Sequence, residues 1–203
     1  MQLNQIMIIP EIYKPLESLI IWDGAFSDRD IEEIISVGEL LEFERGSNKG
    51  VIAVNEGVLN YDIRDTDITW IEPRENTEWL YRRMTEMCAK INDDKFQFDL
   101  THFHPFQYGK YKKDGHYDWH TDSGPTLNEH RKLSFVLGLT DPDDYEGGEL
   151  EINVNGHPDS AEIFKIKKGH LIVFPSYIPH KVRTVTAGER LTLVGWAVGP
   201  KFK

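Results

Sequence analysis

Apolar residues recur at helical spacing in the first half of the chain. Ser27 and Asp30 stand three residues apart in a capping-box arrangement, which predicts the start of a helix. The residues that follow on one helical face are Ile31, Ile34, Ile35 and Leu41. A second such face begins after Asn76 and Thr77 and comprises Leu80, Met84, Met87, Cys88 and Ile91. We therefore expect two amphipathic helices, preceded by a short strand at residues 19–22.

From about residue 96 the pattern changes to short runs of β-branched and aromatic residues. The runs are residues 96–103, 132–140, 149–154, 170–174, 180–185 and 190–198. Turn-forming Asp, Pro and Gly residues separate them. Strands at this spacing, with no helix between them, indicate an antiparallel sandwich or barrel. Helices packed on the outside of one sheet would make the whole fold α+β.

The organisation of the chain predicts one domain. The chain has 203 residues and shows no internal repeat and no Gly/Ser/Pro-rich linker. We expect a single domain over residues 1–203, with a helical N-terminal support in residues 1–95 and a β-rich core in residues 96–203. Two loops, residues 44–60 and 123–131, are candidates for a lid over a binding site.

Composition and charge limit the cellular setting and the partners. No apolar run is long enough to cross a bilayer, and the start lacks the pattern of a secretory signal. Cys88 is the only cysteine, so no intramolecular disulfide can form; its place in the helical stripe predicts a packed residue rather than a nucleophile. These features predict a cytoplasmic protein without membrane contact. The net charge of −11 makes nucleic acid an unexpected partner.

The candidate chemistry lies in a histidine and a carboxylate two residues apart. In a strand, His120 and Asp122 would point to the same side, and a distant His180 could complete a 2-His-1-carboxylate iron site. The His-x-Asp pattern alone is weak, because the chain has eight histidines. Tyr117 and Trp119 should face the opposite side of that strand and pack in the core. The other histidines considered have an ordinary structural interpretation: His102, His104, His130, His157 and His170.

The C-terminal run strengthens the interpretation. His180 follows a turn at a strand start, and Arg190 stands ten residues later at the start of another strand. Thr192 shares the face of Arg190, and a guanidinium beside a hydroxyl suits the distal carboxylate of a dicarboxylic acid. An isolated arginine would more often form a surface ion pair. The ordered combination of His-x-Asp, His and Arg in a β-rich context favours the functional interpretation.

Residues 108–199 resemble the 2-oxoglutarate and iron(II)-dependent dioxygenases, in the prolyl 4-hydroxylase and PKHD-type branch. The resemblance is carried by the runs YKKDGHYDWHTD, EGGELEI and GHLIVFPSYIPHKVRTVTAGERLTLVGW. It implies a double-stranded β-helix, a jelly roll, within the α+β fold. It also implies iron(II) and 2-oxoglutarate as cofactors, with ascorbate as a further candidate.

The resemblance assigns roles residue by residue. His120, Asp122 and His180 would be the catalytic iron ligands, and Arg190 would bind the 5-carboxylate of 2-oxoglutarate. Tyr111 matches a tyrosine that lines the cosubstrate pocket, although a packed strand tyrosine is a comparable interpretation. Where some relatives place a further tyrosine, this chain has Leu137 and Gly138, and Thr192 could replace that contact. Gly147 and Gly148 match a turn with a backbone role.

The implied reaction is hydroxylation of an unactivated C–H bond, with release of succinate and CO2. Related halogenases have a small residue where this chain has Asp122, which favours hydroxylation. The expected substrate is a peptidyl, prolyl-type side chain; a free amino acid or small metabolite is the alternative. Nucleic-acid demethylation is disfavoured because no second arginine follows Arg190 before Trp196. A non-enzymatic metal-binding β-barrel is the alternative from another class.

Overall fold

The computed structural model describes residues 18–41, 44–46, 48–49, 59–60, 62–124, 128–156 and 160–201. The elements of the first half are β1 (Ile20–Trp22), α1 (Asp28–Glu39), β2 (Glu44–Gly46), β3 (Asn48–Lys49), β4 (Leu59–Asn60), β5 (Arg64–Ile71) and α2 (Glu78–Ile91). Those of the second half are β6 (His102–Phe103), β7 (Phe106–Tyr111), β8 (His116–His120), β9 (Arg131–Gly138), β10 (Tyr145–Gly147), β11 (Leu150–Ile152), β12 (Glu162–Phe164), β13 (Leu171–Pro175), β14 (His180–Val182), β15 (Val185–Gly188) and β16 (Arg190–Val198).

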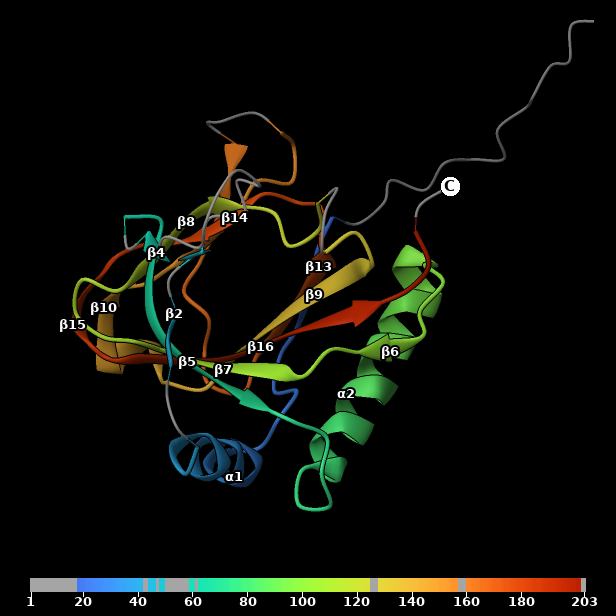
Figure 1. Cartoon of the computed structure of the whole chain (residues 1–203), viewed down its shortest axis with the longest axis horizontal. Helices are drawn as coiled ribbons and strands as arrows, with labels where there is room; N and C mark the ends of the chain where they lie inside the picture. The colour runs from blue at the N-terminus through green and yellow to red at the C-terminus, as the bar shows by residue number, and fades with distance from the viewer. Residues whose placement is uncertain are drawn as a thin grey trace, which may run out of the picture.

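The strands form a curled antiparallel arrangement, a jelly-roll double-stranded β-helix (Figure 1). One half of the sheet runs in the order β1-β13-β9-β16-β7-β5, and the other continues as β8-β14-β11-β12. Strand β5 joins the halves, because residues 67–71 pair with β7 and residues 64–65 pair with β8. The chain has the α+β fold expected from the sequence.

Two apolar layers fill the molecule, and strict alternation along the central strands separates them. On β9, Leu133, Phe135 and Leu137 belong to the layer shared with the helices, whereas Val136 belongs to the second layer. Strand β13 repeats the pattern, with Val173 in the helical layer and Phe174 in the other. Because both faces are covered, β13 is buried along its whole length and β9 is buried from Lys132 onward. The second layer is the one that surrounds the functional residues.

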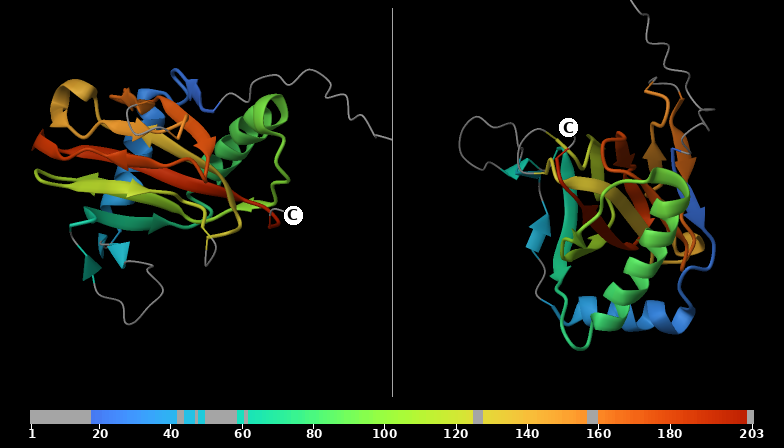
Figure 2. Two further views of the ribbon diagram at one scale, coloured as in Figure 1. Left: turned by 90° about the horizontal axis from the view of Figure 1, so that it is seen from above. Right: turned by 90° about the vertical axis from the view of Figure 1, so that its right-hand side faces the viewer.

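Both helices lie on the same outer side of the sheet (Figures 1 and 2). Ser27 caps α1 in the expected capping box: the Asp30 amide donates to Ser27 Oγ at 3.3 Å, and the Ser27 amide donates to Asp30 Oδ2 at 2.8 Å. The buried residues of the two helices are Ile31, Ile34, Gly38, Leu80, Met84, Met87, Cys88 and Ile91. The predicted stripes therefore pack on the sheet, with Ile35 and Leu41 at their edge.

The expected strand over residues 96–103 is mostly wrong. Helix α2 runs on into a π-helical turn at Asn92–Phe96, and only His102–Phe103 form a strand. The Asn92 side chain explains the difference, because it pairs with both the N–H and the carbonyl of Phe98 at 2.9 Å. Those backbone groups are thus satisfied without a neighbouring strand.

The helical support expected in residues 1–95 also contains strands. Strand β5 lies in the middle of the sheet order, and β1 pairs with β13. The sequence of β5, RDTDITWI, begins with four polar residues and lacks the apolar run that marks the predicted strands. The run at 180–185 also divides, into β14 and β15.

Cys88 and the glycine pair behave as the sequence predicts. The Cys88 side chain is buried in the helical layer, and burial raises the pKa of its thiol to about 12. Gly147 and Gly148 have φ angles of +71° and +66°. A Cβ on Gly147 would lie 2.1 Å from the Thr184 carbonyl oxygen, so this turn requires glycine. In the described part of the chain, neither helix has the length and apolar character needed to span a bilayer.

The capping box gives a stability prediction. We expect Ser27→Ala to lower the free energy of unfolding by about 1 kcal/mol, because the Asp30 amide loses its acceptor. Urea unfolding followed by circular dichroism measures the change. The matched control is Thr85→Ala on α2, where an exposed helical hydroxyl is removed and a change within about 0.5 kcal/mol is expected. Equal effects of the two substitutions would contradict a specific role of the cap.

Candidate metal centre

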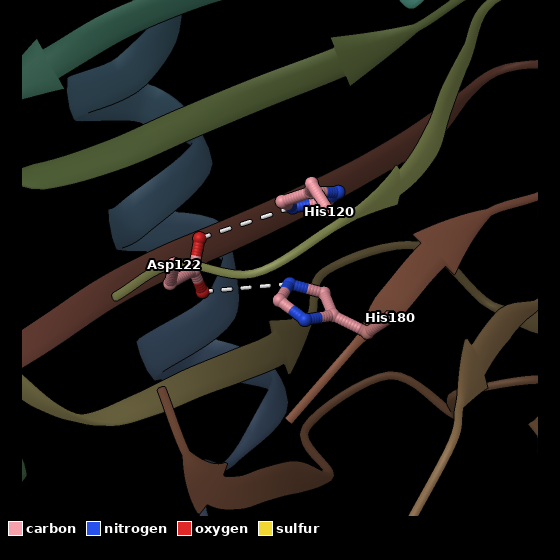
Figure 3. A group of neighbouring side chains, drawn as sticks. All are labelled: His120, Asp122 and His180. Atoms are coloured by element: carbon pink, nitrogen blue, oxygen red, sulfur yellow. Dashed lines mark ion pairs between the residues drawn. The ribbon is translucent and has the colours of Figure 1, made fainter. Parts of the chain in front are cut away.

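His120, Asp122 and His180 lie together, as Figure 3 shows. Each offers one ligand atom, and these atoms all lie within 4.8 Å of one another. His120 Nε2 is 3.8 Å from Asp122 Oδ1, and His180 Nε2 is 3.4 Å from Asp122 Oδ2. Among the described residues no other group of three His, Cys, Asp or Glu side chains is arranged in this way. The three side chains form the donor set of a facial triad.

Strand pairing and a turn position the three side chains. His120 ends β8 and pairs directly with His180, which begins β14. The expectation that Asp122 shares a strand with His120 is wrong, because Asp122 lies beyond the end of β8. The amides of Asp122 and Ser123 both donate to the Ser176 carbonyl at 2.9 Å. This turn, rather than strand alternation, aims the carboxylate at the two imidazoles.

Trp119 does not pack in the core as expected, and Tyr117 packs against the second apolar layer but on the same side of β8 as His120. The Tyr117 ring stacks on His120 with centroids 3.5 Å apart, and Trp119 is 38% exposed. Strand β8 contains a bulge: two steps along β14, from His180 to Val182, match three steps along β8, from His120 to Tyr117. The extra residue moves Tyr117 onto the same side as His120, which an alternation rule without a bulge does not anticipate.

Backbone carbonyls hold both imidazoles in the orientation that a metal requires. His120 Nδ1 is 2.8 Å from the Asp118 carbonyl oxygen, and His180 Nδ1 is 3.0 Å from the Ile178 carbonyl oxygen. A carbonyl oxygen only accepts, so each Nδ1 carries the proton and donates it. Each Nε2 is then left to face Asp122, with a lone pair available to a cation.

The electrostatics favour a bound cation. Burial and the neighbouring His180 lower the pKa of His120 to about 3, so its ring is neutral. Burial alone would raise the pKa of Asp122, but the imidazoles of His180 and His120 hold it well below its usual range. Burial opposes charge on His180 too, yet the Asp122 carboxylate raises the pKa of this imidazole. A divalent cation would take the place of the His180 proton beside Asp122.

Ser134 supports the carboxylate from β9, and no sequence pattern predicts this role. Its hydroxyl donates to Asp122 Oδ2 at 2.7 Å and lies 2.9 Å from Ser176 Oγ. Ser134 is completely buried, and it occupies the inward-facing position between Leu133 and Phe135. A lone serine in an apolar strand is recognised as part of the site only when the turn at Ser176 is placed beside it.

A cavity of about 230 Å³ opens beside the three side chains. All six residues selected from the sequence line it: Tyr111, His120, Asp122, His180, Arg190 and Thr192. Arg190 and Thr192 are buried, at 2% and 1% exposure, because both lie on the inner face of β16. Tyr111 pairs with Arg190 across β7 and β16, and its ring centroid is 5.1 Å from Arg190 Cζ.

The inner end of the cavity fits a carboxylate. Arg190 Nη2 and Thr192 Oγ1 are buried and have no hydrogen-bond partner among the described residues. Unpaired buried donors are costly, and a carboxylate of a bound molecule would satisfy both. The residues present therefore fit a metal ion at the triad together with a carboxylate-bearing molecule that reaches Arg190.

The absence of a tyrosine at Gly138 has a structural reason. A Cβ on Gly138 would lie 2.5 Å from the Lys167 carbonyl oxygen, so the backbone occupies the space that a side chain would need. Tyr145 on β10 lies beside Arg190 instead. Burial raises the pKa of Tyr145, and the Arg190 guanidinium acts in the opposite direction. A Cβ on Gly148 would touch both side chains.

The remaining sequence candidates lie elsewhere. The rings of His102 and His104 lie near each other beside β16, with centroids 6.3 Å apart. His170 Nδ1 lies 2.9 Å from Asp23 Oδ1. His157 and most of the proposed lid at residues 44–60 lie outside the described residues, as do residues 125–127 of the second lid. A larger cavity, of about 670 Å³, lies between α2 and β6. None of the six selected residues lines that cavity.

The part of the chain that carries these residues is similar to known proteins. Residues 106–198 match the model of the 2OG-Fe(II) oxygenase superfamily. This region of the chain, just under half of its length, is similar to that superfamily. A PKHD-type hydroxylase of Synechococcus sp. strain CC9311 is 42% identical over 93 residues, covering 46% of this chain and 41% of the relative. The chain thus spans about two fifths of the length of the curated relatives it matches.

Two solved structures share the fold. A Pseudomonas putida prolyl-4-hydroxylase superposes with a TM-score of 0.70 at 22% identity, covering 90% of this chain and 93% of the other. A Trichoplax adhaerens prolyl hydroxylase, solved with a fragment of the hypoxia inducible factor oxygen degradation domain, has a TM-score of 0.71 at 16% identity. It covers 89% of this chain and 83% of the other. These likenesses show that the jelly-roll fold extends over most of the chain.

The Ser134 contact gives a prediction for metal affinity. We expect Ser134→Ala to weaken binding of iron(II), or of manganese(II) as a surrogate, by about tenfold to a hundredfold, because Asp122 loses the bond that fixes its orientation. Calorimetric titration of metal-free protein measures the change. Thr85→Ala, remote from the triad, is the control and should bind as the parent does. An unchanged affinity in Ser134→Ala would exclude this positioning role.

Proposed function

We propose that the chain is an iron(II)- and 2-oxoglutarate-dependent dioxygenase that hydroxylates an unactivated C–H bond. The observation that carries the proposal is one cavity lined by His120, Asp122 and His180. Two buried polar atoms in the same cavity, Arg190 Nη2 and Thr192 Oγ1, have no hydrogen-bond partner among the described residues. The superfamily match over residues 106–198 supports the same reaction class.

In the proposed assignment, His120, Asp122 and His180 hold the iron. Three protein donors leave coordination positions for a cosubstrate and oxygen, and bound iron supplies the redox chemistry. Asp122 carries a full negative charge, because its pKa lies far below neutrality. A carboxylate ligand at this position favours a hydroxylase over a halogenase.

Arg190, Thr192 and Tyr111 position 2-oxoglutarate in this assignment. The Arg190 guanidinium and the Thr192 hydroxyl bind its distal carboxylate, and Tyr111 covers the guanidinium from β7. Burial of these groups excludes water, which strengthens the ionic contact and fixes the cosubstrate relative to the metal ligands. Succinate and CO2 are then the expected coproducts, and ascorbate is a candidate accessory reductant.

The proposed substrate is a peptidyl, prolyl-type side chain. Support comes from the prolyl hydroxylases that share the fold, one of which was solved with a peptide. A free amino acid or small metabolite is the alternative within the same chemistry. A nucleic-acid substrate is disfavoured by the net charge of −11. A non-enzymatic metal-binding barrel would bind iron but would not turn over 2-oxoglutarate.

Anaerobic titration tests the cofactor assignment. Addition of 2-oxoglutarate to the iron(II)-loaded protein should produce a weak visible charge-transfer band, because the cosubstrate chelates the metal. Absorbance spectroscopy under argon measures it, and iron-loaded Asp122→Ala serves as the comparison. A parent protein that binds iron but shows no band would favour the non-enzymatic barrel.

Replacement of Arg190 tests the cosubstrate site. We expect Arg190→Gln to raise the KM for 2-oxoglutarate by about tenfold to a hundredfold, because a charge-assisted pair to the carboxylate is lost. Succinate release at varied 2-oxoglutarate concentration measures it. The matched control is Arg82→Gln on the exposed face of α2, where the partner is Glu78. Equal KM values for Arg190→Gln and the parent protein would remove Arg190 from its assigned role.

A further inference from the structure

The cavity has a second cationic end, remote from Arg190. The inner face of β16 runs from Arg190 to Trp196, six residues apart, which is roughly 20 Å along a strand. Arg131 Cζ lies 3.6 Å from the Trp196 ring centroid, and Arg64 Cζ lies 4.6 Å from the Tyr117 ring centroid. Both arginines line the cavity. The cavity therefore holds three guanidinium groups, one at the cosubstrate end and two at the other.

The triad lies near the end of the cavity that is remote from Arg190. Trp196 pairs with Ser134, the residue that holds Asp122, so the triad is level with the Trp196 end of β16. On the other wall, the Tyr117 ring stacks on His120, and the Arg64 guanidinium lies over the same tyrosine ring. A molecule bound to Arg64 and Arg131 would thus lie beside the metal ligands, on the side away from Arg190.

Neither arginine at this end pairs with a carboxylate among the described residues. Arg64 donates to Gln107 Oε1 at 2.6 Å, and its Nε is buried without a partner. Arg131 Nε reaches only His104 Nδ1, at 3.5 Å. Asp122 is the one acidic residue among the described cavity lining, and it already contacts His180 and Ser134.

Several other arginines of the described chain pair with carboxylates. The described pairs include Arg82 with Glu78, Arg83 with Asp30 and Arg183 with Glu151. The contrast is physical: burial lowers the pKa of Arg131, and the positive charge of Arg64 acts in the same direction, whereas Asp122 opposes it. Two partly buried like charges repel each other, and an anion that enters between them relieves this repulsion. The arrangement is therefore suited to bind an anionic group.

We infer that Arg64 and Arg131 bind a carboxylate of the substrate, so that this enzyme acts on a carboxylate-bearing molecule. The inference rests on the proposed function and narrows its substrate class. Two guanidinium forks match the planar geometry of a carboxylate. The side chain of Gln107, on β7, accepts a hydrogen bond from Arg64 and so fixes the position of its guanidinium. Ile68, Val194 and Trp196 supply apolar walls for the carbon skeleton.

The carboxylate can come from more than one source. A free amino acid, the C-terminus of a peptide and the side chain of Asp or Glu all present the same group. In each case the carbons next to the carboxylate lie beside His120 and its neighbours, where hydroxylation takes place. An uncharged internal peptide segment would leave both guanidinium groups unneutralised.

Equilibrium binding under anaerobic conditions tests the inference without turnover. The probes are the free amino acids, their N-acetyl derivatives and their N-acetyl amides, titrated calorimetrically into protein loaded with iron(II) and 2-oxoglutarate. We expect at least one acid to bind about tenfold or more tightly than its amide, because only the acid forms charge-assisted bonds. Tight binding of the N-acetyl amides of Asp and Glu would identify a side-chain carboxylate as the source. A comparison of free amino acids with N-acetyl amino acids separates a free amino acid from a peptide C-terminus.

Matched variants assign the effect to this end of the cavity. Arg64→Gln and Arg131→Gln should each weaken binding of the preferred acid by about tenfold while leaving the amide unchanged. Arg82→Gln removes an exposed charge outside the site and should change neither. Circular dichroism shows whether Arg131→Gln folds. If it does not fold, Arg64→Gln decides alone, because Arg131 rather than Arg64 packs on Trp196, which contacts Trp70.

The outcomes separate this inference from the proposed function. Equal binding of acids and amides, no binding of any acid, or unchanged binding in both arginine variants would overturn the carboxylate site. The charge-transfer band with 2-oxoglutarate is recorded on the same samples. A band that persists in the parent and variants while acids show no preference refutes the carboxylate site alone, whereas a missing band in the parent refutes the oxygenase assignment itself.

Discussion

The antiparallel pairing of β8 with β14 is the contact on which the site depends. It places His120 directly opposite His180, although sixty residues of chain separate them. The bulge in β8 then turns Tyr117 to the same side, and the turn held by the Ser176 carbonyl aims Asp122 between the imidazoles. A loss of register between these two strands would separate His120 from His180, because the backbone pairing of the strands places them opposite each other.

The jelly roll makes room for polar chemistry inside an apolar molecule. Alternation along β9, β13 and β16 sends one set of side chains to the helices and the other toward the cavity. The helical set is almost entirely apolar and supplies the stability of the sheet. The inward set can then include Ser134, Arg190 and Thr192, whose polar atoms meet one another, the proposed ligands or the cavity. The helices on the outer side thus allow the inner face to be functional.

Charge is unevenly distributed between the molecule and its cavity. The chain carries a net charge of −11, yet the described cavity lining has three arginines and one acid. Arg190 comes from β16, Arg64 from β5 and Arg131 from β9, so no local sequence motif predicts the cluster. The net negative charge repels an anionic molecule at long range, whereas the arginines of the cavity attract a carboxylate that has entered it.

The sequence by itself determined the two helices, most of the strands and the identity of the candidate residues around the cavity. These depend on local patterns: a capping box at Ser27, period-2 runs, and His-x-Asp followed by His180 and Arg190 at family spacing. Tertiary structure decided what local patterns cannot carry. It placed Asp122 on a turn rather than a strand, turned Tyr117 toward His120 through a bulge, and brought Arg64 and Arg131 to one cavity. The physical reason is that register, bulges and long-range contacts depend on which strands meet across the sheet, and that choice is made by the whole chain.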